Sequence, residues 1–179
     1  MYTIDLQKLG KRKIDQFILE KVGSAPIFKG GIKKLRGVTG FYFEDEISGT
    51  RLMYNVNIAL FEKGLGLYCR NRHYNFLVLI PFAEIGHINL SKRVDELQIK
   101  SFSWFTLASK FGLTYWKSKN YLLESEIIAL YPLVAIIAME DGKSITLKSE
   151  SSNIDRAILF FKTLPWEGFL KVKIETYTQ

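Results

Sequence analysis

The sequence predicts a mainly β protein with a minor helical part, built as a single domain of 179 residues. Three observations carry this prediction. Short segments rich in branched and aromatic residues follow one another between residues 38 and 90, separated by Gly, Asn or Pro. An Asp-Gly pair at 141–142 lies between two further apolar segments, and an amphipathic helical pattern comes next. Together they favour an antiparallel barrel or sandwich with one capping helix.

The chain length suits one hydrophobic core, since two cores of this size would each bury little surface. Changes in residue pattern divide the chain into five parts. These are an N-terminal helical extension (1–25), antiparallel strands (26–90), an aromatic-rich insertion (91–131), a hairpin plus capping helix (132–164) and a terminal strand (165–179).

The first part contains a short amphipathic helix. Ile14, Phe17, Ile18 and Val22 recur at helical spacing between polar residues, and Gly23 is placed to end the helix. The narrow apolar stripe favours packing against the surface of a core.

Five strands are predicted next, forming an antiparallel meander: 38–43, 52–61, 65–70, 76–81 and 84–90. Glu62-Lys63-Gly64 reads as the turn between the second and third strands, with Gly64 expected to supply the positive φ of a tight hairpin. The polar residues 71–75 form the loop to the fourth strand.

The insertion combines eight aromatic residues with several lysines. Phe102, Phe105 and Ala108 fit a helix, whereas the aromatic residues after Gly112 fit a helix or a strand equally well. The pattern indicates mixed structure and leaves the choice between helix and strand open.

The last parts have the clearest signals. Residues 133–139 and 144–148 predict a hairpin whose turn contains Asp141-Gly142. A helix over 152–164 follows, with Ser152 as its N-cap, Asp155 in its first turn and Pro165 beyond its end. Its apolar face consists of Ile154, Ala157, Ile158, Phe161 and Leu164, and the alternating residues 169–175 predict one more strand.

This order of elements resembles that of bacterial pleckstrin-homology-like (PH-like) and GRAM-like domains. The resemblance rests on residues 60–68 (strand, acidic turn with Gly, strand), on 80–85 (Ile-Pro-aromatic-x-x-Ile) and on the hairpin and helix from 140 to 164. The chain departs from the pattern in having Phe160 and Phe161 where the final helix of the family has a tryptophan, and in its insertion and terminal strand.

The resemblance also implies a site for anions or lipids. PH-like domains that bind phosphoinositides use basic residues on and between the first two strands, and the matching residues here are Lys33, Lys34, Arg36 and Arg51. The net charge of +7 agrees with this position, because residues 1–36 hold nine Lys and Arg against three acidic residues. A solvated basic face is the alternative interpretation.

The sequence contains no pattern typical of a catalytic or metal site, so we expect a protein that is not an enzyme and has no cofactor. Cys69, Arg70, Arg72 and His73 lie close in sequence, but adjacent strand residues point to opposite faces. One Cys and two His are too few for a zinc site.

We therefore expect a non-catalytic interaction module that binds a protein or peptide, with an anionic membrane surface as the alternative and nucleic acid disfavoured. Trp104, Phe105 and Trp116 are the predicted contact residues for a membrane or partner. The terminal strand completes its own sheet or pairs with a second copy to form a homodimer. The expected location is the cytoplasm, either free or at the inner membrane surface.

Overall fold

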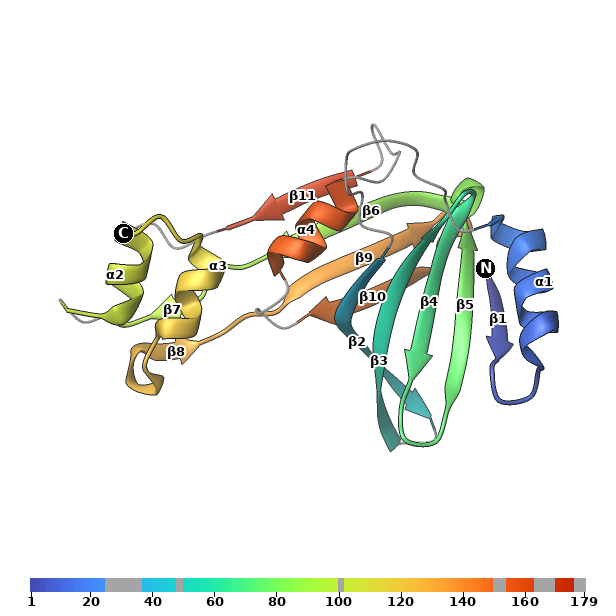
Figure 1. Ribbon diagram of the computed structural model, residues 1–179, viewed down its shortest axis with the longest axis horizontal. Helices are drawn as coiled ribbons and strands as arrows, with labels where there is room; N and C mark the ends of the chain where they lie inside the picture. Colours follow the sequence, from blue (N-terminus) through green and yellow to red (C-terminus); the bar gives the residue numbers. More distant parts are fainter. Residues whose placement is uncertain (25–36, 48–49, 100–101, 150–153, 163–169, 176–179) are drawn as a thin grey trace.

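The protein is mainly β, and its centre is one large mixed sheet (Figure 1). The computed structural model describes residues 1–24, 37–47, 50–99, 102–149, 154–162 and 170–175. The strand order of the large sheet is β1-β5-β4-β3-β2-β10-β9-β6-β11. These strands are β1 (Tyr2–Asp5), β2 (Gly37–Ile47), β3 (Thr50–Phe61), β4 (Gly64–Arg70), β5 (Asn75–Pro81), β6 (Ile85–Lys92), β9 (Leu133–Met139), β10 (Ser144–Ser149) and β11 (Leu170–Ile174).

The five predicted strands and the later hairpin are confirmed, but only four of the strands form the meander, because β6 pairs with β9 and β11 rather than with β5. β2 to β5 pair in sequence order and antiparallel, and β9 pairs with β10 across the Asp-Gly turn, where Gly142 has a φ of 84°. Alternate residues of β9 are buried, as expected of a strand with one face on the core.

The two halves of the sheet join through only a short ladder between β10 and β2. There the hydroxyl of Ser149 donates a hydrogen bond of 3.0 Å to the carbonyl of Gly40. The sheet is not closed: its end strands are β1 and β11, and these two do not pair with each other in the described part of the chain. The predicted mainly β fold is confirmed, but the predicted antiparallel barrel or sandwich differs from the structure in two respects: one sheet stays open, and β11 runs parallel to β6.

Strand β1 was not predicted from the sequence, which indicated only a helical extension for residues 1–25. Its four residues pair antiparallel with β5. The predicted helix is confirmed as α1 (Lys11–Val22), ending at Gly23 with a φ of 76°. Ile4 and Val22 are buried with residues of β3 and β5 in a small second core.

The main core lies on the opposite face of the meander, where α4 (Ile154–Lys162) packs over the sheet (Figure 1). Phe161 meets Phe41 of β2 edge to face, with ring centroids 6.0 Å apart. Phe160 is buried as well, although the predicted apolar face did not include it, and Ile158 is only half-buried. Ser152 and Leu164, the first and last residues of the predicted helix, lie outside the described residues.

The terminal strand is confirmed as β11, and it pairs with β6 of its own chain. Residues Leu170 and Ile174 pack against the main core, whereas Lys171 and Lys173 are exposed. A homodimer formed through this strand stays a prediction, and light scattering on the full chain and on a chain ending at Pro165 would test it.

Gly64 is required in the β3–β4 turn for a different reason from the predicted one. It is not among the described glycines with positive φ. Instead, a Cβ at this position would lie 2.6 Å from the carbonyl oxygen of Ile80 and 2.5 Å from Cγ1 of Val22. Glycine therefore lets α1 and β5 approach the start of β4.

We expect Gly64→Ala to destabilise the protein by about 1–3 kcal/mol, because the backbone of β5 cannot yield as a flexible side chain would. Denaturant unfolding measures the change. Gly10→Ala is the matched control, since a Cβ there meets nothing within 4 Å. Equal stability of the two variants would contradict the packing argument.

Candidate functional site

Residues 93–131, which we call the lobe, project from the end of the sheet between β6 and β9 (Figure 1). The lobe contains α2 (Trp104–Lys110), α3 (Tyr115–Ser118) and three-residue 3-10 turns at Lys119–Tyr121 and Glu124–Glu126. A two-stranded sheet of β7 (Glu96–Leu97) and β8 (Ile127–Ala129) completes it. The prediction of mixed structure in the insertion is confirmed, with helices in its aromatic part.

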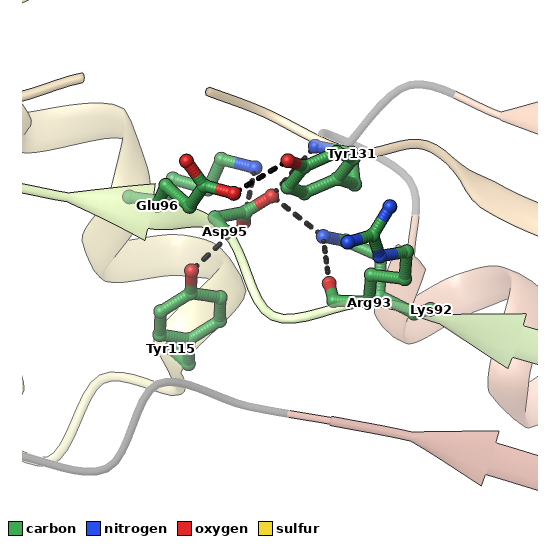
Figure 2. Close-up of polar contacts among 7 residues, drawn as sticks. Lys92, Arg93, Asp95, Glu96, Tyr115 and Tyr131 are labelled. Carbon is green, nitrogen blue, oxygen red and sulfur yellow. Dashed lines mark hydrogen bonds and ion pairs between the residues drawn. The ribbon is translucent and has the colours of Figure 1, made fainter. Parts of the chain in front are cut away.

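A buried ionic cluster joins the lobe to the sheet, as Figure 2 shows. The side chain of Asp95 is fully buried, as is that of Lys92 at the end of β6. The Nζ of Lys92 lies 2.6 Å from Oδ1 of Asp95, and the Nζ of Lys119, after α3, lies 2.8 Å from Oδ2. One carboxylate thus contacts two ammonium groups from segments far apart in the sequence.

Two tyrosines complete this Asp95 cluster, which consists of Lys92, Asp95, Tyr115, Lys119 and Tyr131. The hydroxyl of Tyr115 donates to Oδ2 of Asp95 at 2.8 Å, and the backbone N–H of Tyr131 donates to Oδ1 at 2.8 Å. Asp95 therefore accepts four hydrogen bonds, two on each oxygen. These hydrogen bonds connect β6 and the segment before β9, which together form the neck of the lobe, with α3 and the turn after it.

Further contacts lie beside the cluster (Figure 2). The hydroxyl of Tyr131 donates to Oε1 of Glu96 at 2.6 Å. The guanidinium of Arg93 lies 4.5 Å from the centroid of the Tyr131 ring, a cation–π distance. Next to Arg93, the backbone N–H of Glu175, just after β11, donates to the backbone carbonyl of Lys92.

The electrostatics of the cluster favour the ionised carboxylate. Burial alone would raise the pKa of Asp95, but the hydrogen bonds from Lys119, Lys92, Tyr131 and Tyr115 outweigh burial and hold this pKa below its ordinary value. Burial lowers the pKa of Lys92, and Asp95 offsets part of that effect. Each carboxylate oxygen of Asp95 already accepts two hydrogen bonds. This arrangement is better suited to holding the lobe in place than to transferring protons.

Aromatic side chains fill the interior of the lobe and also line a hollow on its surface. Phe105 is buried and meets the ring of Tyr115 edge to face at 6.0 Å. Beside it lies an apolar hollow of about 190 Å³. Its walls are formed by Trp104, Leu107, Ala108, Phe111, Leu113 and Tyr121.

The hollow is bordered by large apolar side chains that face solvent. Phe111 is 80% exposed, Trp104 is 59% exposed and Tyr121 is 51% exposed. Phe102, which precedes α2 and does not line the hollow, is 83% exposed. Large exposed apolar side chains gathered around a concavity mark surfaces that bind a partner.

The predicted contact residues fall into three different settings. Trp104 lines the hollow, whereas Phe105 is buried inside the lobe and offers no surface to a partner. Trp116 lies in α3, and its side chain is outside the described residues. Phe111, which sequence reasoning named only as one of many aromatics, is the most exposed wall of the hollow.

The predicted anion site cannot be assembled from the described residues. Lys33, Lys34 and Arg36 lie outside them, and Arg51 lies in β3 with its backbone opposite Glu46, its side chain undescribed. The Asp95 cluster was missed entirely. The only part of the cluster that the sequence could have indicated is the Lys92–Asp95 pair, whose members are three residues apart. No local pattern indicates that Lys119 contacts the same carboxylate.

Cys69 lies away from its basic sequence neighbours. The thiol is buried, donates to the carbonyl of Leu67 at 3.4 Å, and burial raises its pKa to about 12. Arg70, Arg72 and His73 are exposed. Such a thiol stays protonated at neutral pH and does not act as a nucleophile.

Within the described ranges, no group of His, Cys, Asp and Glu is arranged to hold a metal ion. Among the same residues, no helix combines the length and apolarity that crossing a bilayer requires. Comparison with known proteins found no match to a family model, to a curated protein or to a solved structure.

We expect Asp95→Asn to destabilise the lobe by about 3–5 kcal/mol, because it removes the charge that both buried lysines contact. Hydrogen exchange should show faster exchange of amides in α2 and α3, with strands β3 to β5 less affected. Asp141→Asn is the control, since it removes the carboxylate of the exposed Asp141–Lys143 pair. Unchanged exchange in the lobe would contradict the role of the cluster.

The same cluster predicts a dependence on pH. Because the folded-state pKa of Asp95 lies below its ordinary value of about 3.9, its stabilisation is present above that value and is lost as the pH falls through the folded-state pKa. The difference in unfolding free energy between wild type and Asp95→Asn should be constant from about pH 5 to 7 and shrink below about pH 4. A difference that already shrinks near pH 6 would show a raised pKa instead.

Proposed function

We propose that this protein is a non-catalytic, PH-like interaction module that binds a protein or peptide through the hollow of the lobe. The sheet with α4 serves as the scaffold, and the Asp95 cluster holds the lobe on it. The partner inserts an apolar side chain between Trp104, Phe111 and Tyr121.

The order of elements along the chain supports the PH-like part of the proposal. A four-stranded antiparallel meander, three further strands and one helix over the core follow one another, as in the domains that the sequence resembles. The lobe is inserted between the first two of those three strands, and β1 and β11 are additions at the two ends of the sheet.

The observation that carries the binding function is the apolar hollow. Its volume of about 190 Å³ suits an aliphatic or aromatic side chain, and aromatic walls are typical of interface pockets that receive an anchor residue. A concave site can receive a side chain that projects from a protein segment. Binding to a flat bilayer would instead need aromatic side chains that project from the protein into the lipid.

A random peptide display library selected on the full chain tests this function. We expect the selected peptides to carry a large apolar residue, and to bind Phe111→Ser at least tenfold more weakly than wild type in fluorescence anisotropy, as for loss of an interface hot spot. Because Phe111 is 80% exposed, its replacement should leave folding intact.

Phe102→Ser is the matched control, because it makes the same chemical change at an equally exposed phenylalanine outside the hollow. Binding should stay within about twofold of wild type. Peptides that bind wild type and Phe111→Ser equally would place the binding surface elsewhere. A library with no peptide selective for wild type over Phe111→Ser would remove the proposed function.

A further inference from the structure

The chain segment that supplies the hollow carries charges of one sign. Between Glu96 and Glu124 the sequence contains no Asp or Glu, and it contains four lysines, namely Lys100, Lys110, Lys117 and Lys119. This segment includes all the residues that line the hollow. The lining itself is uncharged, and the segment that supplies it contributes lysines and no acidic side chain.

Two of these lysines are available to a partner. Lys110 at the end of α2 and Lys117 in α3 are both exposed. Among the described residues, neither makes an ion pair, whereas Lys119 is buried against Asp95. Forming a contact with a carboxylate would thus cost Lys110 and Lys117 no existing partner.

Several carboxylates of the lobe and of α4 already have hydrogen-bond partners. Asp95 pairs with Lys92 and Lys119, and Glu96 accepts from the hydroxyl of Tyr131. Asp155 of α4 accepts from the hydroxyl of Thr114, next to the hollow residue Leu113, at 3.0 Å. Glu124 is exposed at the far end of the segment. A hydroxyl donor neutralises no charge, so Glu96, Asp155 and Glu124 stay negative, and the positive side chains offered to a partner are the exposed Lys110 and Lys117.

We infer that the hollow takes an apolar anchor from an acidic protein segment, in which Asp or Glu residues flank the anchor and face Lys110 and Lys117. This inference rests on the proposed function and names the class of its partner. Charge complementarity of this kind orients the segment and rejects basic ones, while the anchor in the apolar hollow provides most of the affinity.

The selected peptides provide the first test. Asp and Glu should be enriched near the apolar anchor, and replacing them by Asn and Gln in synthetic peptides should weaken binding about fivefold at low salt. The double variant Lys110→Gln/Lys117→Gln should weaken binding of the acidic peptides by a similar factor, and the loss should decrease as salt is raised.

The double variant Lys11→Gln/Lys13→Gln is the matched control, because it removes the same charge from exposed lysines of α1 at the opposite end of the molecule (Figure 1). It should bind like wild type. If peptides depend on Phe111 but not on their acidic residues or on Lys110 and Lys117, the inference fails and the proposed function stands. If no peptide depends on Phe111, the proposed function fails.

Vesicles of phosphatidylglycerol and phosphatidylcholine complete the experiment, since an anionic bilayer offers the other match to aromatic and lysine side chains. We expect no co-sedimentation that depends on Phe111. Co-sedimentation that is lost in both Phe111→Ser and Lys110→Gln/Lys117→Gln, together with a library that yields no Phe111-dependent peptide, would overturn the inference in favour of a membrane surface.

Discussion

The position of the lobe depends on the four hydrogen bonds that reach the carboxylate of Asp95. Two buried ammonium groups in an apolar interior would be costly, and their contacts with one carboxylate reduce that cost. Since the donors come from β6, from α3 with the turn after it, and from the segment before β9, the carboxylate fixes these segments relative to one another. The hollow lies on the part of the lobe that this arrangement holds.

The large sheet provides the rigid support to which the neck is attached. Its main core combines the meander, the β9–β10 hairpin and α4, whose Phe160 and Phe161 are buried over the sheet. β6 and β9 pair along their length before they diverge into the lobe, and β11 adds a third strand beside β6. The lobe therefore starts from a hydrogen-bonded part of the sheet rather than from a long loop.

The aromatic residues of the lobe divide into two roles. Phe105 and Tyr115 fill its interior, where apolar burial and an edge-to-face contact stabilise a small structure. Trp104, Phe111 and Tyr121 border the hollow and remain in contact with solvent. Exposing such side chains has a cost in solubility, and binding of a partner is a physical reason for a protein to keep them.

Local pattern determined much of the fold: the meander strands, the Asp-Gly hairpin, α1, α4 and β11 follow from hydrophobic periodicity and turn residues close together in the sequence. Tertiary structure decided the rest. β1 is too short to be recognised without its partner β5, and the open sheet, with β1 and β11 as its edge strands, depends on pairings between distant parts of the chain. Sequence composition marked residues 91–131 as rich in aromatic residues, but it could not separate buried Phe105 from exposed Phe111, because helix orientation depends on the neighbouring elements. Nor could it bring Lys119 to Asp95, since that contact exists only after the chain has folded around the neck.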